Sequence, residues 1–149
     1  MEDSVDPATP TKKRKSGVPT GNAGEYFVMG ELLRRGFDAQ LADRNTKGYD
    51  ILVSKETDPD SLKIQIKTVR KDPWYISGNS FKGMMLDRIT VFVLLGDEKA
   101  EKSVRYFIAY NREILERFHK PETWPTNGFM PFDAVKQFEN RWILLRRPK

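Results

Sequence analysis

The stretch that decides the fold is Gly48-Tyr49-Asp50-Ile51-Leu52-Val53-Ser54, followed after a polar segment by Leu62-Lys63-Ile64-Gln65-Ile66-Lys67-Thr68. Both parts are rich in Ile, Leu and Val, which predicts two short strands. The segment between them, Lys55–Ser61, contains Asp-Pro and Ser, which are typical of a hairpin loop. Side chains alternate faces along a strand, so we expect Gln65 and Lys67 to share the face opposite Ile64 and Ile66.

Asp50 begins the first of these strands and is within reach of Gln65 and Lys67. A carboxylate, an amide oxygen and an ammonium group together suit a hard divalent cation beside an amine that activates water. A solvent-exposed sheet face shows the same alternation of polar residues and is the alternative interpretation. Two features favour the site: Gln is uncommon on strand surfaces, and the sequence suggests no structural task for Asp50.

The composition narrows the chemistry of any such site. The chain has 149 residues, enough for one domain with a substantial core. It has no Cys and a single histidine, His119, which excludes thiolate zinc sites and cysteine nucleophiles and disfavours a Ser-His-Asp triad. A metal would have oxygen ligands, which favours magnesium, manganese or calcium. No apolar run approaches the length of a membrane span, so we expect a cytoplasmic protein.

The charge is compatible with a polyanionic partner. There are 26 basic and 21 acidic residues, which gives a net charge of +5. Four basic residues near the two strands are candidates for nucleic-acid contacts: Lys63, Arg70, Lys71 and Lys82. Aromatic residues lie among them, and we expect these either to contact nucleic acid or to pack in the core: Trp74, Tyr75 and Phe81.

The N-terminal part is predicted to be a disordered basic arm, residues 1–19, followed by a helix. The run Lys12-Lys13-Arg14-Lys15 suits phosphate binding or nuclear import, and a solubilising tail is an equal alternative. The helix is expected to start at Thr20, with Thr20 or Asn22 as its cap, and to stop at Gly36. Glu25 would then lie in its first turn near the buried side, where an unpaired carboxylate is costly.

The rest of the chain predicts a mixed α/β layer structure. We expect strands over 37–42, 89–95, 104–109 and 141–145, an irregular segment over 68–85, and a loop over 121–131. Short helices are expected over 113–119, capped by Asn111, and from Asp133 onward. This order indicates an α/β fold with a mixed central sheet flanked by helices, and the first helix packs back on it with Glu25 directed towards Asp50.

The order Glu25, then Gly48-Tyr49-Asp50, then Gln65-Ile66-Lys67 resembles the PD-(D/E)XK nuclease superfamily, over roughly residues 20–108. Members share an acid on the first helix, a strand-borne Asp and an acid-x-Lys strand on a restriction-endonuclease-like core. Gln65 stands where most members have Glu or Asp. Some small intron-encoded homing endonucleases in the superfamily use Gln there, and the layout is also similar to restriction-type members.

The resemblance implies a nuclease domain over residues 20–149 that hydrolyses phosphodiester bonds of double-stranded DNA. Mg²⁺, with Mn²⁺ as a substitute, would be held by Asp50, Gln65, the Ile66 carbonyl and Glu25, with Lys67 acting on the attacking water. A dimer or tetramer would address both strands. Gln65 removes one negative charge, which predicts weaker metal binding. The alternatives are a catalytically inactive nuclease-fold DNA-binding module and an interaction domain unrelated to nucleic acids.

Overall fold

The computed structural model describes residues 17–43, 45–46, 48–55 and 58–146, so residues 1–16 of the predicted basic arm, including Lys12–Lys15, lie outside them. The helices and strands follow in the order α1 (Val18–Arg34), β1 (Asp38–Leu41), β2 (Ile51–Lys55), β3 (Asp58–Val69), β4 (Trp74–Ser77), β5 (Ile89–Leu94), β6 (Arg105–Tyr110), α2 (Asn111–Ile114), β7 (Asn127–Met130) and α3 (Phe132–Val135). Short 3₁₀ turns are η1 (Gly78–Phe81), η2 (Gly83–Asp87), η3 (Leu115–Arg117), η4 (Lys136–Phe138) and η5 (Trp142–Arg146). In this part of the chain, none of the helices combines the length and apolar character needed to cross a bilayer.

The main sheet has five strands in the order β1-β2-β3-β5-β6. Pairing is antiparallel except between β3 and β5, which run parallel. The register places Ile64 of β3 between Ile51 of β2 and Ile89 of β5. This arrangement confirms the mixed sheet flanked by helices, and a separate two-stranded sheet is formed by β4 and β7.

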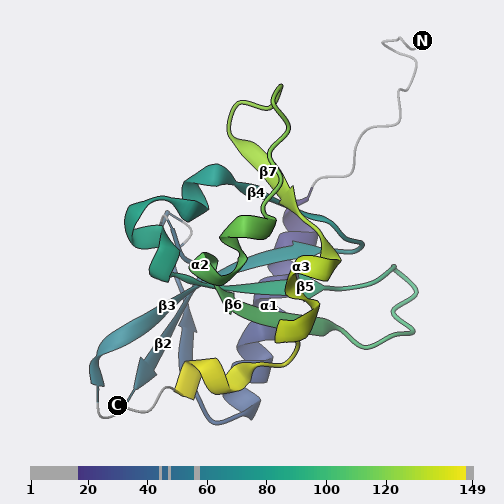
Figure 1. The fold of residues 1–149 in the computed structure, drawn as a ribbon. Helices are drawn as coiled ribbons and strands as arrows, with labels where there is room; N and C mark the ends of the chain where they lie inside the picture. The colour runs from purple at the N-terminus through teal and green to yellow at the C-terminus, as the bar shows by residue number, and fades with distance from the viewer. Residues whose placement is uncertain (1–16, 44, 47, 56–57, 147–149) are drawn as a thin grey trace.

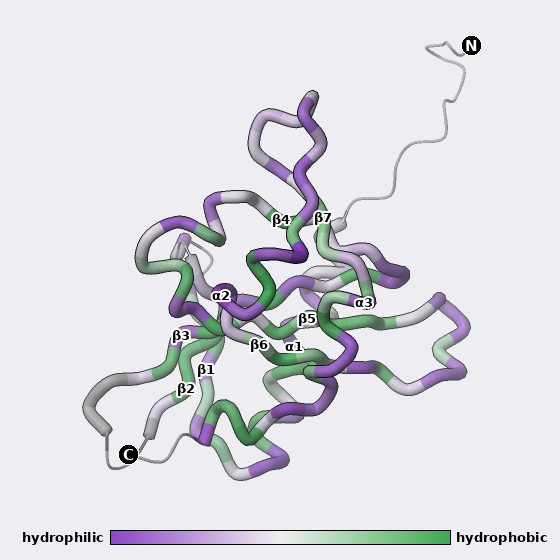
Figure 2. The backbone as a smooth tube through the Cα atoms, viewed as in Figure 1, coloured by the Kyte–Doolittle hydropathy of each residue, from purple (hydrophilic) through white to green (hydrophobic). Residues whose placement is uncertain are grey.

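Each face of the main sheet carries its own hydrophobic core. Val28 and Leu32 of α1 pack on the face that presents Ile64 and Ile66. On the other face, a second cluster gathers around Phe92 and includes residues of α2, α3, β4 and β7. Figure 1 shows α1 on one side of the sheet and α2 and α3 on the other, and Figure 2 shows the central strands as largely hydrophobic. The result is three layers with β3 and β5 in the middle.

Close packing between α1 and β3 depends on Gly24. A Cβ atom at this position would lie 1.8 Å from Thr68 Oγ1, so only glycine lets the helix approach the strand this closely. The contact positions the next residue, Glu25, relative to β3. Thr68 Oγ1 is buried without a hydrogen-bond partner, as expected for a hydroxyl pressed against a helix backbone.

We expect Gly24→Ala to destabilise the protein by about 1–3 kcal/mol because it overpacks the α1–β3 contact. Chemical denaturation measures this, and a double-mutant cycle with Thr68→Ala tests the cause. The cost of the Gly24 substitution should fall in the Thr68→Ala background, where the clashing Oγ1 is gone. An equal cost in both backgrounds would show that the contact is not responsible.

Several predicted boundaries are corrected at the ends of the chain. α1 begins at Val18, before the predicted start at Thr20, because Pro19 in the first turn suits a helix start. The predicted cap is also wrong, because Gly17 is the cap residue. The predicted strand 141–145 is instead the 3₁₀ turn η5, in which Trp142 and Leu145, three residues apart, are both buried against the core.

Other corrections concern pairings between distant segments. β3 begins at Asp58, so most of the predicted hairpin loop Lys55–Ser61 belongs to the strand. The segments predicted as irregular (68–85) and as a loop (121–131) contain β4 and β7, which pair with each other. Asn111 does not cap a helix from the outside: Tyr110 is the cap of α2, and Asn111 is buried within that helix.

Candidate active site

Asp50 lies immediately before β2, beside the edge of β3. Its N–H donates to the Ile64 carbonyl at 2.8 Å, and its own carbonyl accepts from Ala42 N–H at 2.9 Å. Its side-chain Oδ2 accepts a 2.7 Å hydrogen bond from the backbone N–H of Ile66. Asp50 thus has a structural task that sequence reasoning missed. Its carboxylate accepts the hydrogen bond of a β3 backbone N–H, that of Ile66, at the point where the pairing of β3 with β2 ends. One such bond leaves most of the acceptor capacity of the carboxylate available.

Gln65 and Lys67 flank Ile66 and face away from α1. Ile64 and Ile66 belong to the core under α1, whereas Lys67 pairs with Phe92, a residue of the opposite core. This confirms the predicted alternation along the strand. The Asp50 carboxylate is bound to the backbone of Ile66, the residue between Gln65 and Lys67. All three residues therefore lie where the end of β2 meets β3.

Gln65 has an unusual environment for an amide. Its Oε1 atom is buried and has no hydrogen-bond partner. A buried carbonyl-type oxygen without a partner costs free energy, typically about 1–3 kcal/mol. Such an atom is a candidate ligand for a cation or a substrate group.

Lys67 is partly withdrawn from solvent. Burial lowers the pKa of its ammonium group, and the Asp50 carboxylate raises that pKa in part. The burial effect is the larger of the two because desolvation disfavours the charged form. A lysine with a lowered pKa beside a carboxylate is typical of a catalytic position.

Glu25 approaches Asp50 from α1. Both residues line one hollow of about 390 Å³, together with Asp43, Thr46 and Tyr49 of the segment before β2. Gln65 and Lys67 are not among the residues lining this hollow. The structure therefore gathers Asp50 with Gln65 and Lys67 along β3, and Glu25 with Asp50 across the hollow.

The acids of this region are few. Among the described residues, no group of three or more His, Asp or Glu side chains is placed to hold a metal ion. Any cation here would need the Gln65 amide oxygen and backbone carbonyls as well as Asp50 and Glu25. The Ile66 carbonyl is suitably directed, because the N–H and C=O of one strand residue point to the same edge and its N–H points at Asp50.

Two further residues support the Asp50 segment, and sequence reasoning missed one of them. Arg88 donates a hydrogen bond to the Gly48 carbonyl, and its guanidinium lies 5.8 Å from the centre of the Tyr49 ring. Lys63 Nζ lies 5.3 Å from the same ring. Arg88 precedes Ile89, which pairs with Ile64, so only the parallel β3–β5 pairing places it here. No local pattern marks this role.

The predicted nucleic-acid contacts are spread along the molecule. Lys63 is exposed before Gln65, and Lys82 is exposed between η1 and η2. Arg70 and Lys71 follow the other end of β3 and line a hollow with Asp97, and Arg70 donates to the Gly96 carbonyl at 3.2 Å.

The predicted aromatic contacts divide between core and surface. Trp74 is fully buried, and its Nε1 donates to the Val93 carbonyl at 3.1 Å, so it is a core residue. Phe81 packs against the Phe118 ring, with 4.8 Å between the ring centres. Tyr75 is exposed.

Comparisons with known proteins identify the class of fold. No protein-family model and no curated protein sequence matches the chain. Among solved structures, the Holliday junction resolvase Hjc of Archaeoglobus fulgidus aligns over 87% of this chain and 98% of its own, with a TM-score of 0.54 and 15% identity. A bacterial homing endonuclease aligns over 88% of this chain and 94% of its own, with a TM-score of 0.55 and 12% identity.

The fold is therefore the nuclease-like α/β fold of these two structures. At these identities the likeness concerns the arrangement of the chain, and the chemistry has to be argued from the residues of the site.

Proposed function

We propose that this protein is a metal-dependent DNA endonuclease that hydrolyses phosphodiester bonds. The observation that carries the proposal is the hydrogen bond from Ile66 N–H to the Asp50 carboxylate, because Ile66 is the residue between Gln65 and Lys67 and the same carboxylate acts on the Lys67 ammonium. The nuclease-like fold and a positively charged chain support it, as does the hollow that Glu25 and Asp50 share.

The available ligands fit Mg²⁺, and Mn²⁺ as a substitute. Asp50 keeps free acceptor capacity, Gln65 Oε1 is buried without a partner, and the Ile66 carbonyl faces the same edge. Glu25 would hold a bound water or a second ion across the hollow. All of these ligands are oxygens, which hard divalent cations prefer. A bound ion would supply Lewis-acid stabilisation of the phosphate charge.

Lys67 would act on the attacking water and on the phosphate. Because its pKa is lowered, the ammonium form of Lys67 is a better proton donor than that of an ordinary lysine. The neutral amine form is also more populated at a given pH. The water oxygen forms the new bond to phosphorus, its proton passes to the amine or to solvent, and the bond to the leaving sugar oxygen breaks. Lys67 in its charged form also stabilises the negative charge that grows on the phosphate oxygens.

We infer double-stranded DNA as the substrate, in a homing or restriction context. One site cuts one strand, so cleavage of a duplex favours a dimer or tetramer of this chain. Lys63, Arg70, Lys71 and Lys82 would contribute phosphate contacts on either side of the site. We infer a cytoplasmic location for this enzyme, on the nucleoid if the source is bacterial, with nuclear import through Lys12–Lys15 as the weaker alternative.

The direct test is incubation of purified protein with plasmid, linear duplex and branched DNA in magnesium, manganese, calcium or EDTA. We expect cleavage in magnesium and manganese and none in EDTA. If all DNA substrates stay intact in both metals, the endonuclease proposal fails.

The alternative is an inactive nuclease-fold module that binds DNA, and one observation favours it: Gln65 stands where an acid would strengthen the metal site. It predicts salt-dependent DNA binding without cleavage and without magnesium binding by calorimetry. Binding measured over a range of salt concentrations, beside the cleavage assay, separates the two functions.

A further inference from the structure

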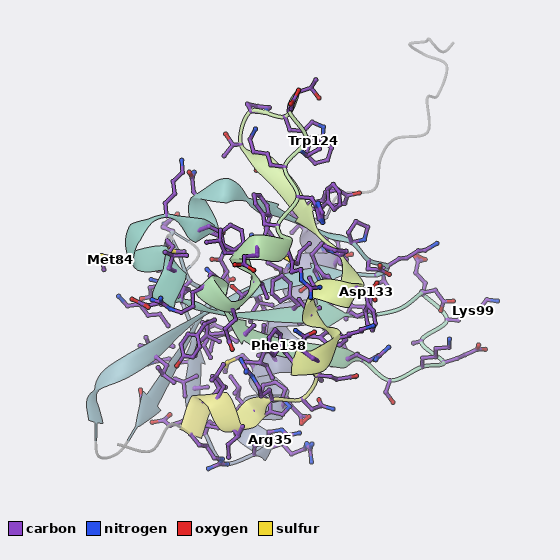
Figure 3. All side chains as sticks on the ribbon, in the orientation of Figure 1. Arg35, Met84, Lys99, Trp124, Asp133 and Phe138 are labelled. Atoms are coloured by element: carbon purple, nitrogen blue, oxygen red, sulfur yellow. The ribbon has the colours of Figure 1, made fainter. Side chains whose placement is uncertain are left out.

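Met84 is the most exposed large hydrophobic side chain among the described residues. It is 85% exposed at the start of the η2 turn, and Figure 3 shows it at the outer edge of this part of the molecule. A single exposed apolar residue is ordinary by itself. Two features distinguish Met84: the segment that carries it is held by buried hydrogen bonds, and basic side chains lie near it.

The segment that carries Met84 is fixed to the sheet by a buried amide. The Nδ2 atom of Asn111 donates hydrogen bonds of 2.9 Å to the carbonyls of Ser80 and Met85, on either side of Met84. Its Oδ1 accepts a 2.6 Å hydrogen bond from the Thr90 hydroxyl on β5. Asn111 is 1% exposed, so these bonds are shielded from water and hold the segment in one conformation.

Basic side chains surround Met84. It lines a hollow of about 860 Å³ together with Lys63, Arg88 and Arg112. The acid in this group, Asp87, pairs with Arg112. Lys82 lies two residues before Met84 and is exposed. Positive charge beside a projecting apolar group suits the phosphates that flank a base step.

The hollow adjoins the candidate active site. Lys63 is two residues before Gln65 on the same face of β3, about 6–7 Å away along the strand. Arg88, which also lines the hollow, donates a hydrogen bond to the Gly48 carbonyl in the segment that leads to Asp50. Met84 therefore lines a hollow that adjoins the strand carrying Gln65 and Lys67.

We propose that Met84 is a wedge that enters between stacked bases and unstacks the duplex beside the cleavage site. Proteins that kink DNA insert apolar side chains, Met among them, between base steps. Pyrimidine–purine steps such as TpA are the easiest to unstack, so the wedge would favour DNA with such steps next to the scissile phosphate. This inference rests on the proposed function, because it takes duplex DNA as the substrate.

The test uses the full chain in EDTA, so that DNA binds without being cut, and short duplexes with TpA steps in which one adenine is replaced by 2-aminopurine. The fluorescence of this base rises when it is unstacked. We expect saturating wild-type protein to raise the signal at one or two neighbouring positions. Met84→Ala should lose most of this rise while its Kd for the duplex changes by less than about threefold, which is about 0.65 kcal/mol.

Two variants serve as controls. Met84→Leu keeps an apolar wedge and should keep the fluorescence rise. Ile143→Ala removes another highly exposed apolar side chain, 72% exposed on η5, and should leave the signal unchanged. Circular dichroism checks that each variant is folded.

Two results would overturn the wedge: an unchanged fluorescence rise in Met84→Ala, or wild-type binding without any rise. If either occurs in a protein that cleaves DNA in magnesium, the wedge alone fails and the endonuclease proposal stands. If the protein binds duplex DNA neither in EDTA nor in calcium and cleaves none in magnesium or manganese, both proposals fail.

Discussion

Lys67→Met should lower the rate of DNA cleavage by about 10²- to 10⁴-fold, the usual contribution of a positioned acid–base group, and leave DNA binding nearly unchanged. The same substitution should raise the melting temperature near neutral pH. Burial lowers the pKa of Lys67, which means that the folded protein holds this charge at a cost. Met keeps the aliphatic packing of the lysine stem and removes the charge.

The pH dependence of stability gives an independent measure of the same effect. An unfolded chain keeps the Lys67 proton up to its ordinary pKa of 10.5, whereas the folded protein releases it at lower pH. Between the lowered pKa and 10.5 the unfolded state binds more protons, so this group makes stability rise with pH in that window. In Lys67→Met this contribution should be absent from melting temperatures measured from neutral to alkaline pH.

Lys99→Met is the matched control. Lys99 is an exposed lysine on the loop between β5 and β6, and Figure 3 shows it far from Met84 and the η2 turn. Its replacement should leave both turnover and the melting temperature nearly unchanged. Retention of full cleavage by Lys67→Met would remove Lys67 from the chemistry.

Asp50→Asn should abolish magnesium binding within the range that calorimetry detects and lower cleavage by at least about 10²-fold. The reason is charge: Asp50 is the carboxylate closest to the β3 edge where Gln65 and the Ile66 carbonyl would complete the site. The amide oxygen of Asn can still accept the hydrogen bond from Ile66 N–H, so the fold should be kept. Manganese binding followed by electron paramagnetic resonance provides a second readout.

Two variants calibrate this result. Asp97→Asn changes another aspartate whose carboxylate accepts a backbone hydrogen bond, from Lys99 N–H at 3.0 Å, and should leave metal binding intact. Gln65→Glu adds a negative charge at the buried amide and should strengthen magnesium binding. If Asp50→Asn bound magnesium with wild-type affinity, the ion would be held by other residues and Asp50 would not be its ligand.

Local sequence determined the elements whose pattern repeats along a single segment. β5 and β6 are largely apolar runs, and α1 has a broad apolar face and is followed by Gly36, so their type follows from residues adjacent in the chain. The alternation of Ile64, Gln65, Ile66 and Lys67 placed two polar residues on one face before any contact was known. Asp50 and the segment Gln65-Ile66-Lys67 could also be recognised as candidate site residues, because each lies in a short continuous stretch of predicted strand.

Only the tertiary structure decided which surfaces meet. The β4–β7 pairing joins segments about fifty residues apart, and η5 is held as a 3₁₀ turn by burial of Trp142, although its sequence resembles a strand. The bond from Ile66 to Asp50 and the contact of Arg88 with Gly48 likewise cross between strands. Such contacts depend on register and on the packing of distant faces, and these are properties of the assembled sheet that no short stretch of chain encodes.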